Sequence, residues 1–358
     1  MKVLHLINEL SDEGGAQRIA LELAREARGT ESSILSIEPV EETLAATLAD
    51  QGVAVSALKP WSLGRFRRGR ELARRADLLQ VHLFPALYLA LCLPGPRVFT
   101  EHNTRNARRE RRWLRPLERC VYRRYARLVC ISEATRAALA AWVGEHPGLR
   151  VIENGVRLER FEAPARARPS APFTLAMTGS FTRQKDQATL LRALALLPLT
   201  YRLLLIGDGP LRAPSERLAS ALGVAERVEF AGWVAHAELP SRLTGVDLYV
   251  QSSHWEGFGL APVEALAAGV PALGSDVPGL AQVLGDPRLL FAPGDAQQLA
   301  RLARRLLEQE DYAARSRAAL KRARAFDGRR MARAYQELWR EVLGPGSDAL
   351  PVDAGGAR

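Results

Sequence analysis

The sequence predicts an α/β protein of two domains, each built on a doubly wound parallel β-sheet. Its 358 residues exceed one ordinary hydrophobic core and suit two. Short apolar runs alternate with amphipathic helical stretches along most of the chain, which is typical of βαβ units. The alternation is interrupted at Glu159–Pro172, where Pro, Ala and Arg replace any periodicity. We therefore expect a first domain over 1–163, a second over 173–326, a C-terminal helix over 327–343 that packs back on the first domain, and a disordered tail over 344–358.

Each expected strand is a short apolar run bounded by polar or turn residues. In the first domain these runs are Val3–Ile7, Ser33–Ile37, Val53–Leu58, Leu78–Leu83, Val98–Glu101, Leu128–Ile131 and Arg150–Ile152. In the second they are Phe173–Met177, Arg202–Ile206, Val228–Phe230, Asp247–Val250, Pro271–Gly274 and Leu289–Phe291. The helical stretches between them include Ala16–Ala27, Asn106–Tyr125, Gln187–Leu197 and Leu211–Leu222, and a helical pattern continues from Asp295 to Leu343 with a break at 326–328. Because ligands bind beyond the carboxyl ends of such strands, we expect functional residues in the loops that follow them.

The composition excludes several classes of protein. The N-terminal MKVLHLINEL has the pattern of a first strand and lacks that of a signal peptide. The longest apolar run, Leu83–Leu93, is shorter than the roughly 20 residues that cross a bilayer. Cys92, Cys120 and Cys130 have no metal-ligand or redox spacing, so we interpret them as core residues of a protein in a reducing compartment. We expect a cytoplasmic protein.

Positive charge is concentrated in the first domain. The chain carries a net charge of +10, and residues 65–127 hold 17 basic and 5 acidic residues, a local balance of 17 − 5 = +12. Two interpretations stay open: a solvated arginine-rich helix face, or a surface that attracts anionic lipid headgroups or a lipid-linked acceptor, with peripheral membrane contact through Arg105–Arg127. Nucleic acid is not expected as a partner, because no aromatic platform is interleaved with the arginines. The densest part of the cluster is Arg105, Arg108, Arg109, Arg111, Arg112 and Arg115.

The most informative segment is 251–271, QSSHWEGFGLAPVEALAAGVP, in which Glu256 and Glu264 flank the start of an expected helix. Unpaired backbone N–H groups and the positive end of the helix dipole at Phe258, Gly259 and Leu260 suit a phosphate, and the carboxylates suit sugar hydroxyls. Two solvated acids at a helix start are the simpler alternative, which leaves the Gly257-Phe258-Gly259 turn unexplained. The segment therefore predicts a site for a sugar joined to a diphosphate.

Three further strand-end loops carry glycines or cations. The loop after the first strand of the second domain contains Gly179, Ser180, Arg183 and Lys185, and its cations could clamp a diphosphate leaving group or simply be solvated. Gly207 and Asp208 follow the next strand, where they either contact the ligand or form a plain turn. Gly14 and Gly15 follow the first strand of the chain and let backbone approach a phosphate, or form a turn only.

His102 follows the strand at 98–101 directly, at the sheet edge where this fold class gathers its active-site groups. An imidazole there can hydrogen-bond and orient a sugar hydroxyl, although a lone histidine is often purely structural. His82 also stands at a strand end and is a weaker candidate, whereas His5, His146, His236 and His254 have no comparable support.

Together these motifs resemble the retaining glycosyltransferases of the GT-B type, in particular glycosyltransferase family 4. The resemblance runs from Gly14-Gly15 to Pro293-Gly294-Asp295, includes Asn154-Gly155-Val156, and places Glu256 and Glu264 on the family's E-x7-E motif. It implies two Rossmann-like domains facing a cleft. It also implies transfer of a sugar from a nucleotide diphosphate, UDP- or GDP-linked, to an acceptor hydroxyl with retention of configuration and without a metal or other cofactor. The acceptor would be a saccharide or a lipid-linked molecule in bacterial surface polysaccharide, lipopolysaccharide or glycolipid synthesis.

The resemblance also implies roles for single residues. Glu256 would contact the donor sugar, Glu264 the nucleotide ribose, and Lys185 the diphosphate, against which Gly15 packs, while His102 would lie near the donor sugar. Family members often carry Gly-Arg where this chain has Gly179-Ser180, so Arg183 is the candidate replacement for the missing cation. Catalytic roles would therefore belong to His102, Glu256 and Lys185. The same fold also serves sugar-nucleotide epimerases and non-catalytic binding scaffolds, which stay open as alternatives.

Overall fold

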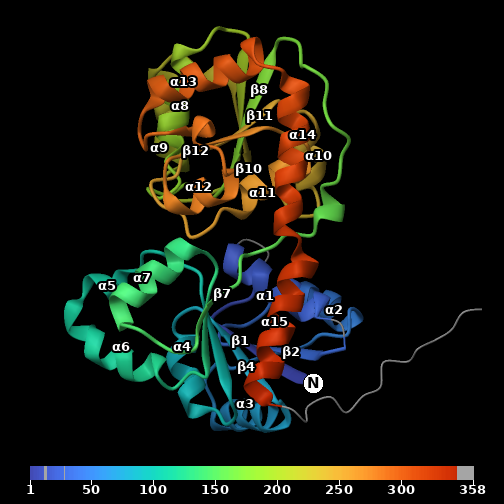
Figure 1. Cartoon of the computed structure of the whole chain (residues 1–358), viewed down its shortest axis with the longest axis vertical. Coiled ribbons are helices and arrows are strands. Elements are labelled where there is room, and N and C mark those ends of the chain that lie inside the picture. Colours follow the sequence, from blue (N-terminus) through green and yellow to red (C-terminus); the bar gives the residue numbers. More distant parts are fainter. Residues whose placement is uncertain (12–13, 28, 345–358) are drawn as a thin grey trace, which may run out of the picture. The chain divides into compact units, whose positions relative to one another are not determined.

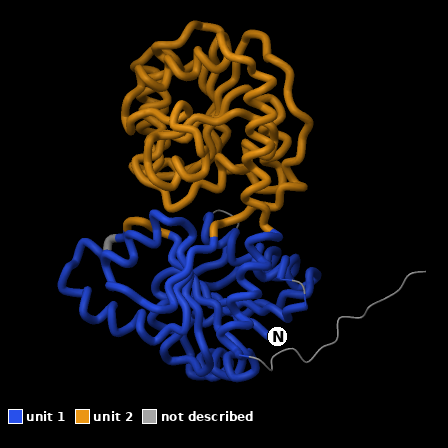
Figure 2. The backbone as a smooth tube through the Cα atoms, in the orientation of Figure 1, with its two compact units in different colours: residues 1–102, 106–152, 329–358 blue, residues 103–105, 153–328 orange. Residues whose placement is uncertain are grey.

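The computed structural model describes residues 1–11, 14–27 and 29–344, so the tail predicted to be disordered lies outside the described residues from 345 onward. The chain forms two compact units (Figure 2). Unit 1 comprises Met1–His102, Asn106–Ile152 and the chain from Arg329. Unit 2 comprises Asn103–Arg105 and Glu153–Gly328. Each unit is a parallel sheet with helices on its faces (Figure 1), which confirms the predicted fold class.

Unit 1 is built on a seven-stranded sheet in the order β3-β2-β1-β4-β5-β6-β7, in which every neighbouring pair is parallel. The strands are β1 Lys2–Ile7, β2 Glu31–Ser36, β3 Ala54–Ala57, β4 Leu78–His82, β5 Arg97–Glu101, β6 Arg127–Cys130 and β7 Leu149–Val151. The helices are α1 Gly15–Glu26, α2 Glu42–Asp50, α3 Leu63–Arg75, α4 Ala86–Leu89, α5 Ala107–Glu110, α6 Arg115–Tyr122, α7 Glu133–Val143 and α15 Gly328–Leu343. Strand order reverses between β1 and β4.

The C-terminal helix α15 packs on unit 1 through aromatic side chains that meet polar groups of the sheet. The Trp339 indole Nε1 donates to Gln80 Oε1 at 2.9 Å, and Tyr335 shares a 3.0 Å hydrogen bond with Thr100 Oγ1. Gln80 Nε2 in turn donates to Thr100 Oγ1 at 2.9 Å. Because both aromatic rings and both partners are buried, these bonds tie the last helix to strands β4 and β5.

Unit 2 is built on a six-stranded parallel sheet in the order β10-β9-β8-β11-β12-β13. Its strands are β8 Phe173–Thr178, β9 Tyr201–Ile206, β10 Val228–Gly232, β11 Leu248–Gln251, β12 Ala272–Ser275 and β13 Leu290–Phe291. Its helices are α8 Gln187–Leu196, α9 Arg212–Ala221, α10 Leu239–Thr244, α11 Leu260–Ala267, α12 Pro278–Leu284, α13 Ala296–Arg304 and α14 Tyr312–Ala323. This is the strand order of a dinucleotide-binding Rossmann fold, which places its ligand where the order reverses, here between β8 and β11.

Every strand predicted from the sequence is present, shifted by at most two residues at either end. The single helix expected over 106–125 is wrong, because α5 ends at Glu110 and a 3₁₀ turn, Arg112–Leu114, separates it from α6. The expected linker 159–172 is packed on unit 2, where the Arg166 guanidinium donates to the carbonyls of Leu243, Thr244, Val246 and Ala268 at 2.6–3.1 Å. Of the three cysteines expected in the core, only Cys130 is buried.

Candidate active site

The centre of the candidate site in unit 2 is an ion pair between Lys185 and Glu256. Lys185 lies in the loop after β8, and Glu256 lies in the loop after β11, so the pair joins the two strands between which the strand order reverses. Lys185 Nζ lies 2.5 Å from Glu256 Oε1, and the two side chains are 22% and 8% exposed. Because the Lys185 side chain is partly exposed, its ammonium can exchange this partner for a ligand.

A chain of buried hydrogen bonds holds the Glu256 carboxylate in place. Ser253 Oγ donates to Glu256 Oε1 at 2.8 Å, Gln251 Nε2 donates to Ser253 Oγ at 2.9 Å, and the Tyr249 hydroxyl donates to Gln251 Oε1 at 2.8 Å. All four residues come from β11 or the loop that follows it, and all are buried. The orientation of Glu256 is therefore set by the strand itself.

The loops after β8 and β9 approach each other so closely that glycine is required. Gly207 has φ +134°, and a Cβ atom there would lie 2.3 Å from the carbonyl oxygen of Gly179. Beside it Asp208 is exposed, accepts from Gly209 N at 2.6 Å and pairs with Arg212 at 2.8 Å. The Gly209 amide and Arg212, the first residue of α9, lower the pKa of Asp208, so neighbouring groups already pair with its carboxylate. Gly207 thus has a packing role, which the sequence left open.

A glycine turn leads into the start of α11. Gly259 precedes the helix with φ +113°, in the left-handed region that favours glycine. Phe258 is buried, and its ring packs edge-on against the Phe326 ring, with the ring centroids 5.3 Å apart. This contact restrains the turn at 257–259. Because the first amides of α11 begin at Leu260, the backbone here presents N–H groups that have no partner inside the helix.

Glu264 lies inside α11 and is only 1% exposed. Its Oε1 atom lies 2.9 Å from Nε2 of His236, in the loop between β10 and α10, and His236 Nδ1 lies 3.2 Å from Nη1 of Arg160. No motif in the sequence includes His236 or Arg160. Nothing in the local pattern signals either one, because they lie 28 and 104 residues from Glu264, on other elements.

Two further predicted residues of the second domain, Ser180 and Arg183, are exposed. Ser180 and Arg183 both lie on the surface of the loop after β8, on either side of the buried Phe181. The structure thus brings Lys185, Glu256 and Gly179 together, and it leaves the Arg183 guanidinium accessible to solvent. Arg183 is therefore still a candidate for the cation that would bind a diphosphate.

The donor-site residues predicted in the first domain, Gly14, Gly15 and His102, belong to unit 1. Gly14 precedes α1 and Gly15 is its first residue, whereas residues 12 and 13 of the same loop lie outside the described residues. His102 directly follows β5 and is buried, and its Nε2 lies 3.1 Å from Nδ1 of His82. Burial lowers the pKa of His102 to about 3, so the ring is neutral near pH 7. A neutral imidazole can donate or accept a hydrogen bond without carrying charge.

The arginine-rich segment uses much of its charge internally. Arg108 pairs with Glu118 at 3.1 Å and Arg109 with Glu101 at 2.6 Å, and both carboxylates are buried. Arg115 donates to the carbonyls of Ala141 and Trp142, and Arg119 donates to that of Val143, which caps the end of α7. Exposed residues of the segment include Arg111, Arg112, Trp113 and Leu117. The solvated or ligand-facing surface is therefore smaller than the charge count suggested.

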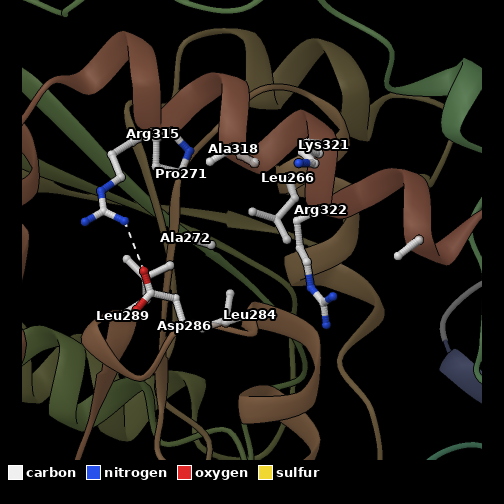
Figure 3. A pocket seen from close by; sticks show the side chains of 12 residues that line it. Leu266, Pro271, Ala272, Leu284, Asp286, Leu289, Arg315, Ala318, Lys321 and Arg322 are labelled. Carbon is white, nitrogen blue, oxygen red and sulfur yellow. Dashed lines mark hydrogen bonds and ion pairs between the residues drawn. The ribbon is translucent and has the colours of Figure 1, made fainter.

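A cavity of about 300 Å³ in unit 2 (Figure 3) is lined by none of the predicted site residues. Its wall is mainly apolar, and the Asp286–Arg315 ion pair, 3.2 Å long, lines it as well. From α11 it takes only Leu266. Over residues 1–11, 14–27 and 29–344, no cluster of three or more His, Cys, Asp or Glu side chains is arranged to hold a metal ion. In the same ranges, no helix is long and apolar enough to span a bilayer.

Comparison with known proteins identifies the family. The models for glycosyl transferases group 1 and for glycosyltransferase family 4 match residues 159–323 and 13–160. The chain is 31% identical to the 2-deoxystreptamine glucosyltransferase of Streptomyces kanamyceticus over 66% of this chain and 70% of that protein. It is also 31% identical to the lipopolysaccharide core biosynthesis glycosyltransferase LpsD of Rhizobium meliloti, over 88% of this chain and 90% of the relative.

A solved structure shares the fold. HepE from Anabaena, in complex with UDP-glucose, superposes with a TM-score of 0.82 at 21% identity, over 95% of this chain and all of that one. This likeness agrees with two Rossmann-like domains of the GT-B type. The family suggested by the sequence motifs is confirmed: the chain belongs to the group 1, family 4 glycosyltransferases.

Proposed function

We propose that this glycosyltransferase moves a sugar from a UDP- or GDP-linked donor to an acceptor hydroxyl with retention of anomeric configuration. The product would enter a bacterial surface polysaccharide, lipopolysaccharide or glycolipid. The observation that carries the donor assignment is the Lys185–Glu256 ion pair beside the start of α11, where the strand order of unit 2 reverses. Further support comes from a relative named for lipopolysaccharide core biosynthesis and from a fold neighbour that contains UDP-glucose.

In this proposal the diphosphate binds to Lys185, to Arg183 and to the backbone amides of 258–260. A diphosphate competes with Glu256 for the ammonium of Lys185, which frees the Glu256 carboxylate to accept from donor-sugar hydroxyls. As the bond to the sugar breaks, negative charge grows on the leaving diphosphate, and fixed cations and helix-end amides stabilise it. The chain thus supplies the charge that a metal provides in other enzymes, and we expect transfer to survive chelation by EDTA.

Three further residues have roles in this proposal. We assign His102 to a hydroxyl of the donor sugar, as a neutral hydrogen-bonding group, and Gly14 and Gly15 to backbone contact with the diphosphate. For the chemical step we favour attack by the acceptor hydroxyl on the same face that the diphosphate leaves. The leaving phosphate oxygen then takes the acceptor proton, and no covalent intermediate on the protein is needed.

Binding and product analysis test this function. In thermal-shift measurements with UDP, GDP, ADP and their sugar conjugates, the ligands of one nucleotide family should raise the melting temperature of the protein. NMR of the product should show the anomeric configuration of the donor. An inverted product would exclude the retaining mechanism, and the lack of any nucleotide-dependent shift would exclude the donor site.

For the acceptor we propose an anionic, lipid-linked molecule that meets the exposed part of Arg105–Arg127, at the inner face of the cytoplasmic membrane. Trp113 is 73% exposed and Leu117 is 53% exposed, and Arg111 and Arg112 lie next to Trp113. Exposed aromatic and apolar side chains among cations suit the boundary between lipid headgroups and acyl chains.

Liposome flotation tests this surface. The wild type should float with vesicles that contain anionic phosphatidylglycerol more than with neutral phosphatidylcholine. Trp113→Ser combined with Arg112→Glu should abolish the difference, whereas Arg202→Glu, on the exposed side of a strand in unit 2, should not. Equal flotation of the double variant and the wild type would refute membrane contact through this segment.

A further inference from the structure

The buried carboxylate of Glu264 has a partner that is not part of its own motif. Glu264 is 1% exposed, and its Oε1 atom lies 2.9 Å from Nε2 of His236. Burying a carboxylate is costly unless hydrogen-bond donors replace the lost water. His236, in the loop between β10 and α10, therefore offsets part of the free-energy cost of burying the Glu264 carboxylate.

Arg160 decides which nitrogen of His236 carries the proton. Arg160 Nη1 lies 3.2 Å from His236 Nδ1, and a guanidinium has donors only. His236 Nδ1 must then be the acceptor, so the neutral ring carries its proton on Nε2. The Nε2–H group then donates a hydrogen bond to Glu264 Oε1. Three residues from three segments thus form a chain of hydrogen bonds with one direction, Arg160 to His236 to Glu264.

Packing also restrains the histidine ring. The Phe161 ring lies 5.7 Å from the His236 ring, tilted by 57°, and Phe161 is buried. Arg160 ends the 3₁₀ turn Leu158–Arg160, so the residue that sets the proton and the residue that holds the ring are neighbours in sequence. The imidazole is fixed in both tautomer and orientation, and with it the Oε1 atom that it contacts.

We propose that Arg160 and His236 are positioning residues that orient Glu264 for a nucleotide ribose, and that they give the donor site its preference for ribonucleotides over deoxyribonucleotides. This inference rests on the proposed function, in which Glu264 accepts from ribose hydroxyls. A carboxylate oxygen has two lone pairs, so an Oε1 that is held by His236 can still accept a second hydrogen bond. Without that restraint the carboxylate rotates, and its bonds to two neighbouring hydroxyls lose their geometry.

Ribose discrimination is the readout that a purely structural role would leave unchanged. Isothermal titration calorimetry compares UDP with 2′-deoxy-UDP, and GDP with 2′-deoxy-GDP, on each variant. The wild type should bind the ribonucleotide about tenfold or more tightly than its deoxy analogue, the contribution of a hydrogen bond to a charged group. His236→Phe should bring that ratio close to one. His236→Gln should retain it, because the glutamine amide offers a donor to Glu264 and an acceptor to Arg160.

Arg160 is tested in the same way. Arg160→Met should reduce the discrimination ratio in the wild-type background and should have no further effect in the His236→Phe background, since Arg160 acts through His236. His146→Ala is the matched control: this half-buried histidine also accepts through Nδ1, from Gly148 N, but belongs to unit 1, so its loss should leave the ratio unchanged.

A second measurement needs no variant to be stable. Long-range ¹H–¹⁵N NMR of the wild type, with His236 assigned through the His236→Gln spectrum, should show a protonated Nε2 and an unprotonated Nδ1. The opposite tautomer would overturn the inference, as would full ribose discrimination in both His236→Phe and Arg160→Met. If the wild type binds no nucleoside diphosphate, the proposed function fails and the inference fails with it. If it binds them without ribose preference, only the inference fails.

Discussion

Substitution of Lys185 by methionine separates the two roles that the structure gives this side chain. Methionine keeps most of the length and apolar surface of lysine and removes the ammonium. The Glu256 carboxylate, whose side chain is 8% exposed, then loses its ion-pair partner and keeps Ser253 as a donor. We expect two effects of different origin: a loss of leaving-group stabilisation and a loss of folding stability.

The two effects have different sizes. Loss of one fixed group that stabilises developing negative charge lowers kcat by about 10²–10³-fold, or about 3–4 kcal/mol. Breaking a buried ion pair costs about 3–5 kcal/mol, and because the Lys185 side chain is 22% exposed we expect about 2 kcal/mol of folding stability to be lost. The double variant Lys185→Met, Glu256→Gln should recover most of that stability, because no lone carboxylate stays buried, yet its transfer rate should stay low.

The assay reads the release of nucleoside diphosphate from the donor that gives the largest thermal shift, with and without acceptor. Stability comes from urea unfolding followed by circular dichroism. Transfer by Lys185→Met within about threefold of the wild-type rate would refute the leaving-group role, since the predicted loss is at least tenfold larger. A double variant as unstable as Lys185→Met would refute the claim that the lone Glu256 carboxylate causes the instability.

Three further predictions concern the fold and its helix ends. Trp339→Phe removes the indole donor to Gln80 and leaves a buried acceptor without it, so urea unfolding should show a loss of about 1–3 kcal/mol. Gly259→Ala forces a side chain into φ +113° and within 2.9 Å of a neighbouring carbon, so calorimetry should show weaker nucleotide binding, by at least about tenfold. The hydrogen bond from Arg288 holds the pKa of Asp286 at about 2, below the usual value near 3.9, so the stability it contributes is complete above about pH 4 and is lost as pH falls towards 2. Asp286→Asn should therefore match the wild type in urea at pH 2 and be less stable at pH 5.

The order of strands and helices could be predicted because a buried parallel strand has a simple sequence signature. Each one is a short apolar run, and the turn residues at its ends are visible in the chain. The break between α5 and α6 was not predictable from periodicity, because apolar and basic residues continue through the 3₁₀ turn at 112–114. There Arg108 and Arg109 of α5 pair with the buried carboxylates of Glu118 and Glu101, which are 0% and 4% exposed.

The residues of the candidate site also divide into those that the sequence pattern predicts and those that it does not. Glu256, Lys185 and the Gly259 turn were predicted because each follows a recognisable strand, and parallel strand ends meet at one edge of a sheet. Arg160 and His236 were missed because their relation to Glu264 exists only in three dimensions. The close approach of the two loops at Gly179 and Gly207 could not be predicted from the sequence either, because a glycine after a strand is compatible with any turn.

The two glutamates of the E-x7-E motif differ in a way that the motif does not express. Glu256 is paired with a flexible ammonium that is partly exposed, so a diphosphate can take that cation away. Glu264 contacts the His236 imidazole, which Arg160 and Phe161 hold in place. Eight residues of separation place the first carboxylate before helix α11 and the second inside it. In the proposed function, the spacing therefore yields one acid that exchanges its ion-pair partner when the donor binds and one that keeps its contact with His236. We therefore expect that mutation can alter charge compensation at the leaving group and recognition of the nucleotide independently.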